Sequence, residues 1–213
     1  MPPVVSVVGR SNSGKTTLVE KIVPELRSRG YRVATVKHAQ DMQLDQPGTD
    51  SWRHIEAGSQ ATVLADKEKV VLIRPAASPP DLNEVVHLLG EDYDIIIAEG
   101  FKAESAPKIE VQRNETGPLL TDLKGLFAVI SDEPVQTKAR KFGWSDIRPL
   151  VDLIEEGFIK PQREHLSVYV NGAPVVLSSF PREFIRNLML AMAASLKGAE
   201  EPKSLEFRFR KGG

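Results

Sequence analysis

Short apolar runs alternate with amphipathic segments along the first part of the chain. Val4–Val8 is a β-branched run that ends at Gly9, which is typical of a buried strand. Residues 15–29 predict a helix that ends before Gly30, and Pro24 is expected to bend this helix or to break its last turn. The apolar positions of the helix recur every four residues, at Leu18, Ile22 and Leu26.

Tyr31–Lys37 is the next strand candidate, and this strand–helix–strand order predicts a βαβ unit whose first two strands are parallel. Three further strands are predicted at Tyr93–Ala98, Lys108–Gln112 and Phe127–Ser131. Three shorter helices are predicted at Thr49–Ala57, Leu82–Leu89 and Asp146–Glu156. Asp81 is a suitable N-cap for the second helix, while Gly58 and Gly157 are expected to end the first and the third.

Two parts of the chain predict antiparallel hairpins. Ala61–Ala65 and Val70–Arg74 are joined by a polar turn and predict a hairpin inserted between the parallel strands. Asn171-Gly172 is a strong two-residue turn signal near the C-terminus. The elements predicted around it are two strands, an amphipathic helix and a strand, at Leu166–Val170, Pro174–Leu177, Pro181–Leu196 and Leu205–Arg210. The apolar stripe of that helix is expected to be core, and it consists of Phe184, Leu188, Ala191 and Leu196.

Composition narrows the class of protein. The 213 residues are 41% hydrophobic and 27% charged, which is ordinary for a globular chain. A net charge of −1 gives no global attraction to nucleic acid or to an acidic membrane, so neither is an expected partner. The absence of cysteine excludes disulfides, thiolate metal sites and a cysteine nucleophile. Without a signal peptide or a long apolar span, the chain is expected to be cytoplasmic.

The first apolar run leads into the stretch "GRSNSGKTT", which matches G-x-x-x-x-G-K-[ST]. Glycine lets the backbone approach phosphate oxygens, and successive N–H groups at the start of a helix form an anion nest. Lys15 is expected to reach the β- and γ-phosphates and to act in catalysis, while the Thr16 hydroxyl is expected to ligate Mg²⁺. The residues expected to contact nucleotide here are Gly9, Ser11, Asn12, Ser13, Gly14, Lys15, Thr16 and Thr17.

With this motif the predicted fold is α/β. Residues 1–160 are expected to form a P-loop NTPase domain, with a mostly parallel sheet flanked by helices and with the hairpin as an insertion. Residues 162–213 are expected to form a small C-terminal α+β module of ββαβ order. A P-loop alone selects neither ATP nor GTP and does not establish hydrolysis.

A second element of the site is expected in "DYDIIIAEGFK". The predicted strand delivers Glu99 and Gly100 to its carboxyl end, where open α/β sheets bind ligands. Glu99 is a variant of the usual aspartate, and it is expected to hold Mg²⁺ directly or through water, or to polarise an attacking water. Lys102 is a further candidate contact, with a solvated loop lysine as the alternative.

The chain resembles the molybdopterin-guanine dinucleotide biosynthesis adaptor protein B family. The resemblance is carried by four stretches in order, "GRSNSGKTTLVEKIV", "VATVKH", "DQPGTDSWRHIEAGS" and "DIIIAEGFKAESAPKIEVQR". It implies a P-loop GTPase of weak intrinsic activity that binds GTP and supports the nucleotidyltransferase joining GMP to molybdopterin. It also implies a homodimer, for which the hairpin at 61–74 is the candidate contact.

The segment between the second strand and the hairpin is expected to act as a switch. Asp50 could cap the helix or hold a magnesium-bound water, and Arg53 could bind an anion. Residues 38–58 would then order around the γ-phosphate or around a bound molybdopterin. His38 and His54 lack metal-ligand spacing, so structural roles are favoured, although His38 stays a candidate contact. The alternative for the segment is a capped surface helix with solvated charges.

The sequence has no Asn-Lys-x-Asp stretch for reading guanine. Asp132 follows a predicted strand and could accept hydrogen bonds from the guanine edge, with a turn acid as the alternative. GTP preference therefore follows from the resemblance. A small-molecule kinase using ATP is the rival interpretation, although no arginine-rich lid is evident. A metallochaperone GTPase is disfavoured, since the chain has no cysteine and only 4 scattered histidines.

Overall fold

The computed structural model describes residues 1–39, 44–162, 166, 168–171, 173–175, 177–197, 205 and 207. By its internal contacts the chain divides into two compact units. One unit is Pro2–Arg163, and the other is Glu164–Gly213 together with Met1.

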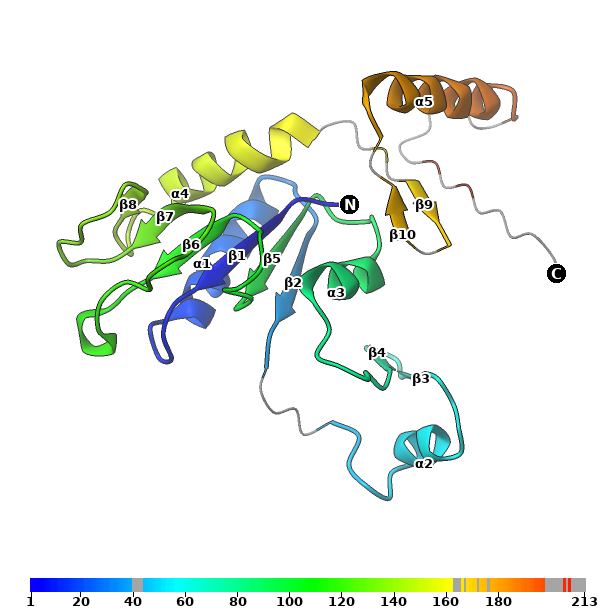
Figure 1. Ribbon diagram of the computed structural model, residues 1–213, viewed down its shortest axis with the longest axis horizontal. Coiled ribbons are helices and arrows are strands. Elements are labelled where there is room, and N and C mark those ends of the chain that lie inside the picture. The colour runs from blue at the N-terminus through cyan, green and yellow to red at the C-terminus, as the bar shows by residue number, and fades with distance from the viewer. Residues whose placement is uncertain are drawn as a thin grey trace. The chain divides into compact units, whose positions relative to one another are not determined.

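A six-stranded sheet forms the centre of the first unit (Figure 1). Its strand order is β2-β5-β1-β6-β7-β8, and every neighbouring pair is parallel. The strands are β1 Val4–Val8, β2 Val33–Lys37, β5 Ile95–Glu99, β6 Lys108–Val111, β7 Leu126–Ile130 and β8 Arg140–Phe142. β1 and β2 are parallel as predicted, but β5 lies between them. This is the mostly parallel sheet that the sequence predicted.

Helices α1 (Lys15–Ser28) and α4 (Ile147–Ile154) pack on one face of this sheet (Figure 1). The predicted stripe of α1 is the buried one, since its three members are fully buried at Leu18, Ile22 and Leu26. Pro24 does not break the last turn, because α1 runs continuously to Ser28. The prediction that the helix at Asp146–Glu156 ends at Gly157 is wrong. A π-helical stretch at Glu155–Ile159 and a 3-10 turn at Lys160–Gln162 follow α4 without a break. They pack on the core, because Ile159 is buried and the Phe158 ring lies 4.9 Å from that of Phe127.

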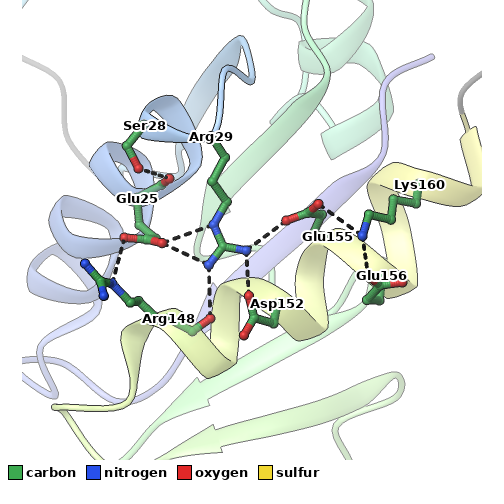
Figure 2. A network of polar contacts seen from close by, with 8 residues as sticks. All are labelled: Glu25, Ser28, Arg29, Arg148, Asp152, Glu155, Glu156 and Lys160. Atoms are coloured by element: carbon green, nitrogen blue, oxygen red, sulfur yellow. Dashed lines mark hydrogen bonds and ion pairs between the residues drawn. The ribbon is translucent and has the colours of Figure 1, made fainter.

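Arg29 joins α1 to α4 and to the turn that follows it (Figure 2). Its guanidinium donates to Asp152 at 2.6 Å, to Glu155 at 2.8 Å and to Glu25 at 2.9 Å. Burial alone would lower the pKa of Arg29, but the hydrogen bonds to these three carboxylates outweigh it and raise that pKa. The same contact with Arg29 lowers the pKa of Glu155. The network fixes the end of α1 that lies away from the phosphate loop.

The other face of the sheet contains a buried polar row on β6. Lys108 and Glu110 on β6, with Gln112 directly after it, alternate with the core residues Ile109 and Val111, so they point to the opposite face, and all three are buried. Each of these three side chains forms hydrogen bonds with backbone groups of the loops near the sheet. Lys108 donates to the carbonyls of residues 104, 106 and 124, Glu110 accepts from the N–H of residue 120, and Gln112 donates to the carbonyl of residue 117. Burial lowers the pKa of Lys108 and raises that of Glu110.

Helix α3 (Leu82–Leu89) packs against β2, with Leu82 and Val86 buried. Asp81 is its N-cap as predicted, and Glu84 completes a reciprocal capping box with it.

Helix α2 (Asp50–Glu56) and the hairpin of β3 (Thr62–Ala65) and β4 (Val70–Ile73) form a separate part of this unit. The hairpin is a sheet of its own, as predicted, and α2 contacts β3. Its cross-strand register puts Val63, Val70 and Leu72 on one face, and all three side chains are exposed.

The second unit contains the predicted hairpin, with β9 (Val168–Val170) paired to β10 (Ala173–Val175), and helix α5 (Ser179–Ala194). The prediction that the α5 stripe is core is wrong for its large members, since Phe184, Leu188 and Leu196 are half exposed or more. The strand predicted at 205–210 lies mainly outside the described residues. Among the described helices, none has the length and apolar composition to cross a membrane.

Candidate functional site

The phosphate loop connects β1 to the first turn of α1 and adopts a conformation that its glycines require. Gly9 and Gly14 have φ of 150° and 97°, and Asn12 has φ of 62°. A Cβ on Gly9 would lie 2.4 Å from the carbonyl oxygen of Val111, and one on Gly14 would lie 2.7 Å from the ring of Trp144. Side chains at these two positions would therefore collide with the neighbouring strands and loops.

The lysine of the loop turns back onto the loop itself. Lys15 Nζ donates to the carbonyls of Arg10 at 2.8 Å and Gly9 at 3.2 Å. The Ser13 hydroxyl is buried without a hydrogen-bond partner. The remaining predicted contacts of the loop have exposed side chains, namely Ser11, Asn12, Thr16 and Thr17. The loop thus brings an ammonium, hydroxyls and the start of α1 to one place, as an anion site requires.

Glu99 faces the phosphate loop from the end of β5, which is the neighbour of β1. The Thr16 hydroxyl contacts both carboxylate oxygens of Glu99, at 2.9 and 3.0 Å. Lys37 Nζ lies 3.5 Å from Glu99 Oε1. The sequence analysis had not included Lys37, but β2 pairs with β5 so that Lys37 lies opposite Glu99. Lys37 could have been found from the sequence only if the pairing of β2 with β5 had been known.

Gly100 and Phe101 follow Glu99 with φ of 101° and 57°. A Cβ on Gly100 would lie 3.0 Å from His38 Cβ, and the His38 ring lies 5.1 Å from the Phe101 ring. His38 therefore packs against this turn, beside Glu99. Lys102 is exposed on the next part of the loop. No cluster of three His, Asp or Glu side chains that could hold a metal occurs among the described residues.

Asp50 and Arg53 lie on α2, where they pair with each other at 3.6 Å and are largely exposed. Thr49, rather than Asp50, caps the helix, and Asp45 accepts a hydrogen bond from Thr49. The role of Asp50 and Arg53 in a nucleotide site stays a prediction.

Asp132 lies past the end of β7, on the other side of β1 from Glu99. Its Oδ1 accepts a hydrogen bond of 3.3 Å from the N–H of Trp144, in the loop after β8. The Arg113 guanidinium lies over the Trp144 ring at 4.8 Å, and Lys21 Nζ lies 5.4 Å from the same ring. Sequence reasoning missed Trp144, because β8 is a three-residue strand with two basic residues that no apolar run marks. It missed Arg113, because the ring that this guanidinium lies over is distant in the sequence.

A cavity of about 500 Å³ opens beside the same edge of the sheet, between the loops after β6 and β7. Its lining is uncharged and combines amides with apolar side chains, at Gln112, Asn114, Gly117, Pro118, Leu119, Pro134, Val135 and Gln136. None of these residues belongs to the phosphate loop.

Comparison with known proteins finds relatives in sequence and in structure. The chain is 36% identical over 156 residues to the molybdopterin-guanine dinucleotide biosynthesis adapter protein of Haemophilus influenzae, covering 72% of this chain and 88% of that protein. A putative adapter protein of the same description from Methanocaldococcus jannaschii is 26% identical and aligns with 95% of both chains.

A crystal structure of a MobB protein homolog from Bacillus stearothermophilus superposes with a TM-score of 0.57 at 27% identity, over 75% of this chain and 99% of that one. The family model of molybdopterin guanine dinucleotide synthesis protein B matches residues 4–132, from β1 to Asp132. The chain therefore belongs to the molybdopterin guanine dinucleotide synthesis protein B family.

Proposed function

We propose that this chain is a GTP-binding adaptor in the biosynthesis of molybdopterin-guanine dinucleotide, with weak GTP hydrolysis. The single observation that supports it most is the pairing of Thr16 with Glu99 over the phosphate loop, in a member of this family. The curated relatives are described as adapter proteins of this biosynthesis, which supports the pathway.

The residues of the loop would hold the phosphates. Lys15 would exchange its carbonyl contacts at Gly9 and Arg10 for phosphate oxygens, since an ammonium binds an anion more strongly than a neutral carbonyl. Backbone N–H groups of residues 11–17 and the N-terminus of α1 would supply the remaining donors. Lys15 would also stabilise charge that develops on the phosphates during hydrolysis.

Thr16 and Glu99 fit a magnesium ion. Both offer the hard oxygen ligands that Mg²⁺ prefers, and two oxygens that share one octahedral ion at about 2.1 Å lie about 3 Å apart. The oxygens of Thr16 and Glu99 are separated by 2.9 and 3.0 Å. Mg²⁺ would neutralise phosphate charge when bound, and Glu99 would hold it or orient a water. Lys37 would be released from Glu99 toward the phosphates.

Guanine preference and the switch segment are further parts of the proposal. Asp132 would accept hydrogen bonds from the guanine N1 and N2 groups, which adenine cannot donate in that pattern. Asp50 and Arg53 would approach the site only if residues 38–58 move toward it, with His38, Gly100 and Lys102 as contacts near Glu99. Their exposure leaves both α2 side chains available for such a contact.

Molybdopterin and two protein partners complete the proposal. The uncharged cavity beside Gln112 suits the amide and amine groups of a pterin ring, which is supported by the three side-chain amides in its lining. The exposed face of the β3–β4 hairpin would pair with a second copy of the chain in a homodimer. The transferase that uses GTP would be the other partner, and the second unit with its exposed α5 stripe is a candidate docking surface for it.

Calorimetric titration with GTP and with ATP, each with Mg²⁺, tests the core of this proposal. GTP is expected to bind at least tenfold more tightly than ATP. Lys15→Ala should abolish binding of both nucleotides, while Lys67→Ala, in the hairpin turn, is the matched control and should change nothing. Equal or tighter binding of ATP would remove the guanine preference and favour the rival kinase.

The kinase alternative has its own measurement. Incubation with γ-labelled ATP and candidate small acceptors would yield a labelled product if the chain transfers phosphate, whereas an adaptor with weak hydrolysis releases only inorganic phosphate. No arginine-rich lid over the phosphate loop is found among the described residues, which supports the adaptor.

A further inference from the structure

An aromatic ring lies directly against the phosphate loop. The indole of Trp144 is so close to Gly14 that a Cβ there would meet two of its ring carbons, at 2.7 and 3.1 Å. Gly14 is the residue from which α1 begins, so the ring borders the point where the loop amides converge. Trp144 is only partly buried, although it packs against the core cluster, and it lies in the loop that follows β8.

Hydrogen bonds hold the backbone of Trp144 in place, and a guanidinium lies over its ring. Lys21 Nζ donates to the Trp144 carbonyl at 3.2 Å, and Asp132 accepts from the Trp144 N–H. The exposed Arg113 guanidinium lies over the ring at 4.8 Å, and one of its terminal nitrogens lies 3.2 Å from the Cβ position of Gly14. No ion pair to a carboxylate is described for Arg113. An indole and a guanidinium together present a flat cationic surface beside the loop.

Strand order shows on which side of the loop this surface lies. Glu99, Thr16 and Lys37 gather on the β5 side of β1, and Arg113 and Trp144 come from the loops after β6 and β8, on the other side. If Thr16 and Glu99 hold Mg²⁺ as proposed, the Glu99 side would be the side of the terminal phosphate, because the metal ion of P-loop proteins neutralises charge there. The nucleoside end of the ligand must then extend toward β6, β7 and β8.

We propose that Arg113 and Trp144 form the surface on which the purine base of the nucleotide stacks. The proposal rests on the proposed nucleotide binding and names the residues that would supply base affinity. Bases stack on aromatic rings and on guanidinium planes whatever their hydrogen-bonding edge. The stack therefore holds any purine, and Asp132, which holds Trp144, gives the choice between guanine and adenine.

The experiment uses the intrinsic fluorescence of Trp144. The chain has 2 tryptophans, so Trp52→Phe leaves Trp144 as the sole tryptophan, which is excited selectively over tyrosine, and this variant is also the matched control for loss of an indole. GTP, ATP and inorganic tripolyphosphate are each titrated with Mg²⁺ into this variant. Both nucleotides should quench or shift the Trp144 emission more strongly than tripolyphosphate does, because only they contain a base.

Affinities of further variants, measured by calorimetry, decide the assignment. Trp144→Leu and Arg113→Gln should each weaken GTP about tenfold or more and leave tripolyphosphate within about twofold. Trp144→Phe keeps a ring and should stay within about threefold of the unmodified chain for GTP. That variant separates lost stacking from damage to the loop, and thermal unfolding checks that each variant is folded.

Four outcomes contradict the inference. Unchanged GTP affinity in Trp144→Leu removes the ring from the site. Equal loss of GTP and tripolyphosphate affinity in Arg113→Gln reassigns that guanidinium to the phosphates. If the unmodified chain binds tripolyphosphate and GTP equally well, no base contact exists although the phosphate loop works, and if it binds neither, the proposed function fails together with the inference.

Discussion

The strand β5 and the hairpin strand β4 have nearly the same kind of sequence and opposite surroundings. Ile95–Ala98 on β5 is fully buried between β1 and β2, whereas Val70 on β4 is 73% exposed and its neighbours are exposed as well. A run of β-branched residues therefore indicates a strand but not its burial. Burial follows from neighbours, and β5 has a strand on each side and helices over one face.

The apolar face of the hairpin, formed by Val63, Val70 and Leu72, has no cover among the described residues. An exposed apolar hairpin is marginal as an isolated element, since two strands bury too little surface between them. The homodimer proposed for this protein would give the hairpin the neighbour that β5 already has. The following predictions contrast the two regions.

The largest effect is expected from core truncation. Ile97→Ala should lower the free energy of unfolding by about 3 kcal/mol, because it removes three buried carbons and leaves a cavity. Val70→Ala in the hairpin should cost less than about 0.5 kcal/mol. Chemical unfolding at low protein concentration measures both. Equal costs would mean that the hairpin face is buried in solution.

The next effect compares ion pairs. Arg29→Met should destabilise the protein by about 2 kcal/mol at pH 7, because three carboxylates lose a shared, mostly buried guanidinium. Arg53→Met breaks an exposed pair on α2 and should cost less than about 0.5 kcal/mol.

The pH dependence of that comparison has a definite sign. The pKa of Glu155 is lowered in the folded state, so its contribution is complete above the unfolded pKa of about 4.3 and is lost as the pH falls through the folded value. The stability gap between Arg29→Met and the unmodified chain should narrow below about pH 4. A gap that does not change with pH would exclude Glu155 as the partner that matters.

Association is the third test. Leu72→Asp puts a charge on the exposed hairpin face and should weaken self-association at least tenfold without lowering the melting temperature. Light scattering coupled to gel filtration measures this, with Lys67→Asp, a charge change in the turn, as control. A dimer that persists in Leu72→Asp assigns the interface to another surface.

The smallest effect concerns the buried carboxyl of β6. Burial raises the pKa of Glu110, and its Oε2 has no hydrogen-bond partner. Above the folded pKa the buried charge costs stability, so Glu110→Gln should stabilise the protein by about 1 kcal/mol at pH 8, and the gain should vanish below about pH 4. Glu68→Gln in the hairpin turn is the control and should have no effect at either pH.

The sequence predicted most strands and helices because each is a short periodic run. It did not predict which strands lie next to each other. The position of β5 between β1 and β2 follows from pairing between residues far apart in the sequence. In "KIEVQR" polar residues alternate with apolar ones, and Lys108, Glu110 and Gln112 are nevertheless as buried as the apolar residues between them. Irregular loops cover that face, and no periodicity reveals a loop that folds over a strand.

For the site, the phosphate-loop motif located Lys15 and Thr16, and the end of an apolar strand located Glu99. Both features are local in the sequence. Lys37 and Trp144 came to light only in three dimensions, since β5 and the loop after β8 bring them to the phosphate loop. Asp50 and Arg53 lie outside both local features, on α2, where they pair with each other. Their assignment came from the resemblance and awaits the binding experiments.

The contacts of Lys15 bear on how such a protein would respond to a changing nucleotide supply. Its ammonium donates to the carbonyls of Gly9 and Arg10, so hydrogen bonds within the chain itself support the conformation of the loop. A preformed loop pays little ordering entropy when it captures a ligand. Occupancy would then follow the free nucleotide concentration by mass action, with the empty and loaded forms equally folded. A partner protein could then distinguish the two forms only by the few side chains whose contacts change when nucleotide binds. In this proposal those side chains are Lys15, Lys37 and Glu99.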